Sequence, residues 1–155
     1  MRQSRLVFLD ETGFDVFLYR EYARAPMGEK IYEKVSGKRF ERQSVVAAKC
    51  GKEILAPFGY TGTCNADLFN FWLKTQLIPT LKKGQVVIMD NASIHKTETT
   101  REIIRDAGCH LVFLPAHSPD LNPIEKIWAH KKHFIKTNMK KFTALIDAIA
   151  ETFSK

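Results

Sequence analysis

The chain has 155 residues, of which 45% are hydrophobic and 26% are charged. This composition is typical of one globular domain and excludes disordered and fibrous proteins. Lys and Arg outnumber Asp and Glu by 24 to 17, and the resulting net charge of +7 suits a polyanionic partner, although it also serves solubility alone. Three cysteines without a CxxC pair indicate neither a disulfide framework nor a zinc site. With no secretion signal or membrane-length apolar run, we expect a soluble cytoplasmic protein.

The first third of the chain is predicted to be rich in β-structure. Apolar runs containing β-branched and aromatic residues predict four strands, over residues 5–10, 16–22, 38–49 and 53–60. A turn around Gly13 is expected to join the first two strands, and residues 23–37 are irregular and partly basic. This region therefore begins as a hairpin or meander.

A helix is expected next, because Asn65 is a suitable N-cap residue. Its Leu68, Phe71 and Trp72 share one face, and Pro79 should end it since proline does not continue a helix easily. The sequence therefore predicts a helix that packs on the sheet.

Helices and strands alternate after residue 80. We predict strands over residues 85–90 and 110–114 and helices over residues 97–107, 123–138 and 142–153. A capping box from Thr99 to Glu102 and a stop at Gly108 define the first of these helices. Asn122 as N-cap and Pro123 at the first helical position open the second. An antiparallel region followed by a βαβ unit predicts an α/β fold with a mixed sheet and a ribonuclease H-like order of elements.

Three acidic residues stand at the ends of predicted elements. Asp10 and Asp90 close apolar strands, and Glu125 opens a helix. Acids that follow neighbouring strands emerge at one edge of an open α/β sheet, so the three are expected to converge. Each has a structural alternative, because Asp10 and Asp90 suit turns and Glu125 stands three residues after Asn122, as in a capping box. Together they predict one metal site.

Carboxylates at such a site indicate phosphoryl transfer. Mg²⁺ or Mn²⁺ is held by a few carboxylates and substrate phosphate oxygens, and two such ions can activate an attacking oxygen and stabilise the leaving one. Without metal, two carboxylates 4 Å apart repel by about 4 kcal/mol at an effective dielectric constant of 20. Bound metal or protonation must therefore relieve the repulsion among the carboxylates.

Three segments, DETGF, MDNASIHK and SPDLNPIEKIW, resemble the DDE transposases of the mariner superfamily, in its bacterial insertion-sequence branch. The 34 residues between Asp90 and Glu125 are also similar to the spacing in that family. The resemblance implies an α/β, ribonuclease H-like domain with a mixed five-stranded sheet flanked by helices. It also implies Mg²⁺ (or Mn²⁺), two ions with DNA bound, and cleavage and strand transfer by a triad of Asp10, Asp90 and Glu125.

The same resemblance implies partners and a location. The partner is double-stranded DNA, both transposon ends and target, bound by a homodimer at the bacterial nucleoid. Helix-turn-helix modules usually precede the catalytic domain in this family, whereas nine residues precede Asp10 here. Residues 1–155 are therefore expected to form a single catalytic domain, with end recognition supplied by a separately encoded N-terminal part. A fragment and a decayed copy remain open.

Residues around the triad have less specific patterns. Glu11 follows Asp10 and should point to the opposite side if the strand continues. Asn91 and His95 are expected either to contact DNA or the metal ligands, or to serve turns and caps. Asp120 and Asn122 are expected to shape the loop before the helix and to cap it.

Helical spacing and charge predict two further groups of side chains. Trp128 shares a helical face with Ile124, which predicts a place in the core. Lysines on the following helix predict contacts with the DNA backbone, although a solvated helix face explains them equally. They are Lys126, Lys131, Lys132 and Lys136, with Lys140 and Lys141 beyond.

Two alternatives to a transposase remain at this level. A metal-dependent nuclease or junction resolvase with a related fold would use the same carboxylates and differ in its products. A truncated, non-catalytic DNA-binding remnant would be insensitive to replacement of Asp90.

Overall fold

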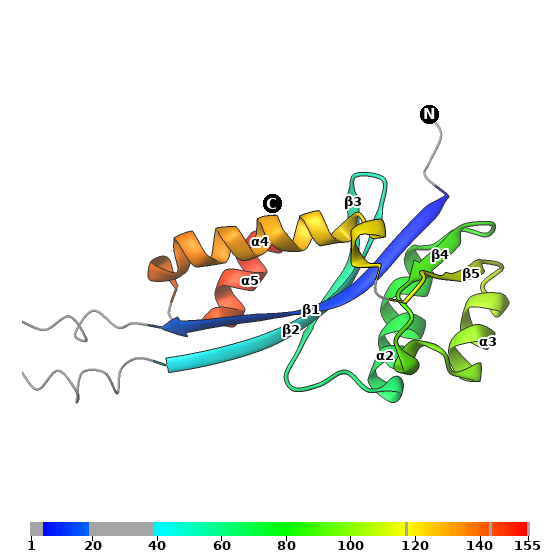
Figure 1. The fold of residues 1–155 in the computed structure, drawn as a ribbon, viewed down its shortest axis with the longest axis horizontal. Helices are drawn as coiled ribbons and strands as arrows, with labels where there is room; N and C mark the ends of the chain where they lie inside the picture. Colours follow the sequence, from blue (N-terminus) through cyan, green and yellow to red (C-terminus); the bar gives the residue numbers. More distant parts are fainter. Residues whose placement is uncertain (1–4, 19–38, 117, 143, 155) are drawn as a thin grey trace, which may run out of the picture.

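The computed structural model describes residues 5–18, 39–116, 118–142 and 144–154. Its centre is a five-stranded sheet in the order β3-β2-β1-β4-β5, with helices beside it (Figure 1). The strands are β1 (Leu6–Leu18), β2 (Arg39–Cys50), β3 (Glu53–Tyr60), β4 (Val86–Met89) and β5 (His110–Phe113). The β1–β2 and β2–β3 pairs are antiparallel, and β1–β4 and β4–β5 are parallel. The predicted mixed sheet is confirmed.

The first strand is longer than the sequence suggested. β1 is one continuous strand of 13 residues, so the predicted turn at Gly13 is wrong. Gly13 lies opposite Ser44 within a ladder that runs from Val7 to Leu18. This ladder pairs the backbone groups of both strands, and that pairing outweighs the turn preference of a single glycine. The predicted strand over residues 16–22 is thus the end of β1, and its residues beyond 18, like the irregular segment 23–37, lie outside the described residues.

Helices cover the two faces of the sheet at different places (Figure 1). They are α2 (Ala66–Trp72), α3 (Glu98–Asp106), α4 (Ile124–Asn138) and α5 (Leu145–Phe153). One core cluster joins α2 and α3 to the sheet through Val46 and Ala48, and the other joins α4 and α5 through Val45 and Ala47. Alternation along β2 therefore separates two cores.

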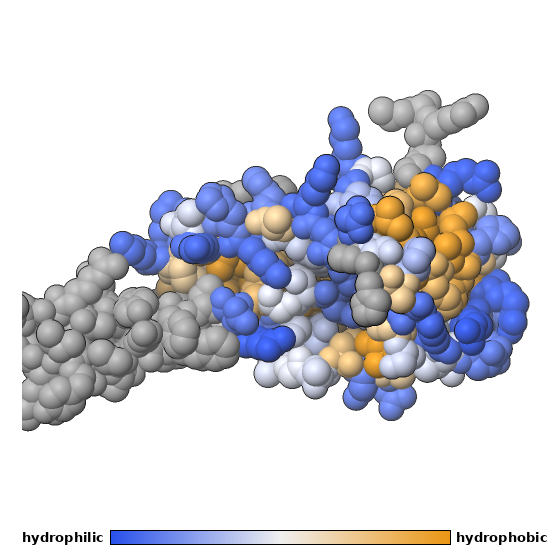
Figure 2. Space-filling view, viewed as in Figure 1, coloured by the Kyte–Doolittle hydropathy of each residue, from blue (hydrophilic) through white to orange (hydrophobic). Residues whose placement is uncertain are grey.

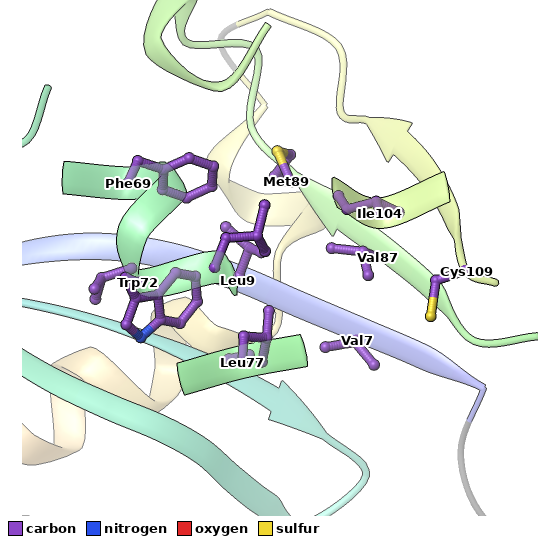
Figure 3. Packing of buried hydrophobic residues seen from close by; sticks show 12 residues of the cluster. Val7, Leu9, Phe69, Trp72, Leu77, Val87, Met89, Ile104 and Cys109 are labelled. Atoms are coloured by element: carbon purple, nitrogen blue, oxygen red, sulfur yellow. The ribbon is translucent and has the colours of Figure 1, made fainter. Parts of the chain in front are cut away.

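The same alternation along β1 separates two acids. Val7 and Leu9 belong to the α2 side, where they pack with side chains of α2, β4 and α3 (Figure 3). Phe14 belongs to the α4 side. Because side chains alternate along a strand, Asp10 faces α4 and Glu11 faces α2.

The helix after Asn65 forms as predicted but buries a different face. Asn65 Oδ1 accepts a hydrogen bond from the backbone N–H of Leu68 at 2.8 Å. Phe69 and Trp72 are buried, whereas Phe71 is 52% exposed, so the expected place of Phe71 on the packing face is wrong. A π-helix over Leu73–Leu77 and a 3-10 turn over Ile78–Thr80 continue the chain. Pro79 is accommodated at the start of that turn, where its missing N–H costs little.

The start of α3 and the start of α5 differ from the predicted positions. Thr97 caps α3, accepting a hydrogen bond from Thr100 N–H at 3.2 Å, so the predicted cap at Thr99 is wrong. Gly108, with φ at +77°, ends the helix region as expected. α5 starts at Leu145, later than the predicted residue 142, because the backbone is extended at Phe142 and Ala144. Trp128 is in the core as predicted, 2% exposed.

Candidate active site

The three predicted acids lie where β1, β4 and α4 meet. Parallel pairing of β1 with β4 extends to Phe8 opposite Ile88, and Asp90 follows β4 directly. Asp10 does not close a strand, as the sequence suggested, because β1 continues along β2. It is β4 that ends beside Asp10. Glu125 occupies the first turn of α4.

The three carboxyl groups converge on one another. The Asp10 side chain forms hydrogen bonds with those of Glu125 and Asp90. Burial, the hydrogen bond and charge of Glu125, and the charge of Asp90 together raise the pKa of Asp10 to about 9. The predicted convergence is therefore observed, with a proton retained between acids that would otherwise repel.

A cavity of about 410 Å³ opens over this acidic cluster. Its lining residues are Asp10, Asp90, Asn91, Ala92, Leu114, Pro115, Ala116, Ser118, Asn122 and Glu125. The loop after β5 and the three acids thus line the same cavity. Asn91 is exposed at this cavity, whereas Asp120 is exposed on the 3-10 turn before α4.

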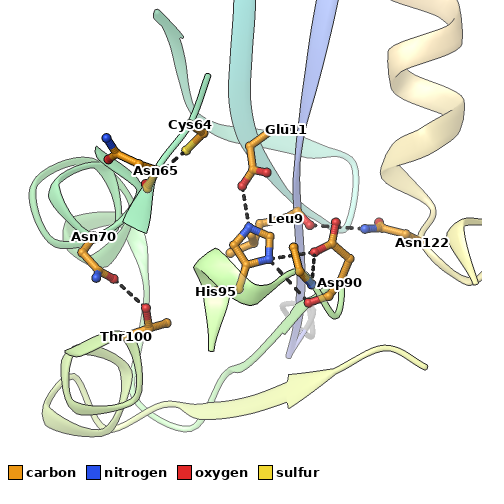
Figure 4. Close-up of polar contacts among 10 residues, drawn as sticks. Leu9, Glu11, Cys64, Asn65, Asn70, Asp90, His95, Thr100 and Asn122 are labelled. Carbon is orange, nitrogen blue, oxygen red and sulfur yellow. Dashed lines mark hydrogen bonds and ion pairs between the residues drawn. The ribbon is translucent and has the colours of Figure 1, made fainter. Parts of the chain in front are cut away.

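His95 links the cluster to the opposite face of the sheet (Figure 4). It is fully buried, with Nδ1 at 2.8 Å from Asp90 Oδ1 and Nε2 at 2.6 Å from Glu11 Oε1. Burial opposes the charged ring, but the hydrogen bonds and charges of Asp90 and Glu11 prevail and raise the pKa of His95 to about 10. The hydrogen bond from His95 in turn lowers the pKa of Asp90, against the effect of burial.

Sequence reasoning missed the role of Glu11. Its side chain points away from Asp10, as alternation along β1 predicted, but it is bound to His95 rather than simply displaced. The partners are 84 residues apart, and no spacing in the sequence relates them.

Asn122 ties the start of α4 to β1. Its Nδ2 donates to the backbone carbonyl of Leu9 at 3.2 Å, and its Oδ1 accepts from the backbone N–H of Ile124 at 3.1 Å. The side chain is buried. The N-cap position of α4 is Pro123, one residue later than predicted, but the Asn122 side chain still accepts from the first helical N–H. Its second hydrogen bond, unforeseen in the sequence, ties the start of the helix that carries Glu125 to β1.

The predicted DNA-contacting lysines divide into two groups. Lys126, Lys132 and Lys136 are exposed, on a surface where hydrophilic side chains are frequent along α4 (Figure 2). Lys131 instead donates to the backbone carbonyl of Thr152 and lies 5.1 Å from the Phe153 ring. Its aliphatic stem and charge thus serve packing against α5.

The acids are suited to a hard cation but are not arranged around one. Among the described residues, no group of three His, Cys, Asp or Glu side chains has the spacing of a formed metal site. Instead, Asp10 hydrogen-bonds to the other two acids. An all-carboxylate donor set is nevertheless the kind that Mg²⁺ and Mn²⁺ use, and a cation there would replace the proton that Asp10 retains.

The fold and the clustered acids define a ribonuclease H-like α/β domain. Over 97% of its length the chain resembles the solved structure of the Mos1 transposase catalytic domain and raltegravir with Mg, covering 71% of that chain, with a TM-score of 0.63 and 17% identity. The family model of the DDE superfamily endonuclease matches residues 5–150, and the chain belongs to this family.

A shorter match relates the chain to a whole transposase. Over 39 residues, 25% of the chain, it is 49% identical to the Tc3 transposase of Caenorhabditis elegans, of which the match covers 12%.

The described helices include none long and apolar enough to span a membrane.

Proposed function

We propose that this chain is the catalytic domain of a DNA transposase, which cuts DNA strands and joins them to a target in a divalent-metal-dependent reaction. Asp10, Asp90 and Glu125 are the proposed catalytic triad and metal ligands. The observation that carries the proposal is the convergence of these three carboxyl groups, from positions far apart in the sequence, in the lining of one cavity.

The donor set supports Mg²⁺ or Mn²⁺ as the cofactor, with two ions when DNA is bound. Such ions supply activation of the attacking oxygen and stabilisation of the leaving oxygen at phosphorus. The chain itself holds the carboxylates, through His95 at Asp90 and Asn122 before Glu125. The Mos1 catalytic domain, which this chain resembles in fold, was solved with Mg.

The cavity is open to a substrate strand beside a basic helix. Exposed Lys126, Lys132 and Lys136 of α4 follow Glu125 along the chain, and we propose that they contact DNA phosphates. Lysines used in this way strengthen binding without reading base sequence. This arrangement supports double-stranded DNA as the substrate class.

The test separates strand transfer from hydrolysis. Labelled duplex with a free 3′-hydroxyl end is incubated with supercoiled plasmid, the full chain and Mn²⁺. A transposase joins the labelled strand to the plasmid, whereas a simple nuclease or resolvase yields only shortened label. Asp90→Asn should abolish both reactions, and Asp106→Asn, which changes an exposed acid on α3, should leave them unchanged. Activity that persists in Asp90→Asn contradicts the triad, and a non-catalytic remnant gives no product.

We further propose the finer assignments that the sequence suggested. These place the chain in the bacterial insertion-sequence branch, acting at the nucleoid as a homodimer on paired DNA ends, with residues 1–155 as one catalytic domain. Size-exclusion chromatography with light scattering, with and without DNA, tests the dimer.

A further inference from the structure

The two strands that carry Asp10 and Asp90 separate just before these residues. Parallel pairing of β1 and β4 extends from Leu6 opposite Val86 to Phe8 opposite Ile88. Continuing that register places Asp10 opposite Asp90, two positions beyond the last paired residues. Backbone hydrogen bonds between β1 and β4 therefore do not fix the distance between the two acids, and side chains must do so.

His95 spans this gap. Its Nδ1 binds Asp90 at the end of β4, and its Nε2 binds Glu11, the neighbour of Asp10 on β1. Both ring nitrogens face carboxylate oxygens, which accept hydrogen bonds, so the ring donates from both sides. One side chain thus joins the end of β4 to β1 at the level of the acidic cluster.

The surroundings of His95 hold its ring in one orientation. The side chain is 0% exposed, and its ring centroid lies 4.4 Å from that of Phe69 on α2. The backbone N–H of Ala92 donates to the same Asp90 oxygen at 3.0 Å. Asp90 Oδ1 is therefore bound twice, by the His95 ring and by the Ala92 N–H, and this orients the carboxylate relative to Asp10.

We propose that His95 is a positioning residue that sets the orientation of Asp90 and its separation from Asp10, with Glu11 anchoring the far side of the ring. The proposal rests on the proposed function, because it treats both acids as metal ligands. Residues that orient metal ligands in this way contribute typically 10–100-fold to metal affinity.

The test measures binding of Mn²⁺ alone to the full chain, from the electron paramagnetic resonance signal of the free ion. Two substitutions each keep one of the two side-chain hydrogen bonds of His95. The amide nitrogen of His95→Asn takes the place of Nδ1 and keeps a donor for Asp90, whereas that of His95→Gln takes the place of Nε2 and keeps only the bond to Glu11. We expect His95→Gln to weaken Mn²⁺ binding by about 10–100-fold and His95→Asn to retain most of the affinity.

Controls separate positioning from loss of structure. Thr100→Val removes a partly buried hydrogen bond of 2.6 Å to Asn70, between α3 and α2, and should lower stability without changing Mn²⁺ affinity. Glu11→Ala leaves the ring in place and frees its far side, so it should also weaken Mn²⁺ binding. Equal losses in His95→Asn and His95→Gln, or unchanged binding in His95→Gln or Glu11→Ala, would overturn the proposal.

Asp90→Asn distinguishes this inference from the proposed function. If the unaltered chain binds Mn²⁺ and Asp90→Asn does not, the metal site stands and the His95 variants decide the positioning role. If the unaltered chain and Asp90→Asn bind Mn²⁺ equally, Asp90 is not a ligand, and the proposed function and this inference fail together.

Discussion

Replacing Asn122 by alanine tests how the start of α4 is attached to the sheet. The substitution removes the acceptor for Ile124 N–H and the donor to the Leu9 carbonyl. Loss of an N-terminal cap costs about 0.5–2 kcal/mol, and an unpaired buried carbonyl costs about 1–3 kcal/mol. The expected loss of unfolding free energy is about 2–4 kcal/mol, which lowers Tm by roughly 5–15 °C in a chain of this size.

Urea unfolding followed by circular dichroism measures this loss. Asn122→Ser is the matched variant, because serine keeps a capping oxygen but is too short to reach Leu9. It should recover the cap contribution alone and fall between the native chain and Asn122→Ala. A loss below about 1 kcal/mol in Asn122→Ala, less than the two contributions give together even at their smallest, would refute the assigned role, and so would equal losses in the two variants.

Three further predictions concern pH, backbone conformation and DNA. The raised pKa values of Asp10 and His95 give stability that is complete at low pH. It is lost progressively above about pH 4 for Asp10 and about pH 6.5 for His95, so Tm of the metal-free chain should fall most steeply between about pH 6.5 and 9, where both groups contribute. Stabilisation by Mn²⁺ should grow over this range, because metal requires ionised carboxylates; a flat profile would contradict both shifts. Gly108→Ala should cost roughly 1–2 kcal/mol in urea unfolding, because φ at this position is +77°. The double variant Lys132→Ala, Lys136→Ala should reduce the slope of the logarithm of the DNA-binding constant against the logarithm of salt concentration by roughly two if both lysines contact phosphates. An unchanged slope would show that both lysines are only solvated.

The order of elements could be predicted from the sequence because its signals are local. Short apolar runs, the cap at Asn65 and the stop at Gly108 all act within a few residues of themselves. The errors arose where distant contacts override local preference. Gly13 suggested a turn, but its pairing with Ser44 on β2 keeps β1 extended, and residues that far apart carry no signal of their alignment.

The site shows the same division between local and distant causes. The acidic cluster could be predicted, because Asp90 follows β4 and Glu125 opens α4. Asp10 was expected at a strand end and lies instead within β1, beside the end of β4. The contacts of His95 with Glu11 and of Asn122 with Leu9 join residues 84 and 113 positions apart. Their residue types suit turns and caps equally well, so only the three-dimensional arrangement reveals which role each has.

The anchor at Asn122 has a consequence for how this domain can diversify. Leu114, Pro115, Ala116 and Ser118 line the cavity on the loop that follows β5, and Asn122 fixes the end of that loop to β1. Insertions upstream of the anchor would therefore reshape the substrate-facing wall without displacing Glu125, since loop length costs little free energy. The shape of the cavity wall can thus change while the three acids keep their positions, so the loop after β5 is the place to introduce a new specificity.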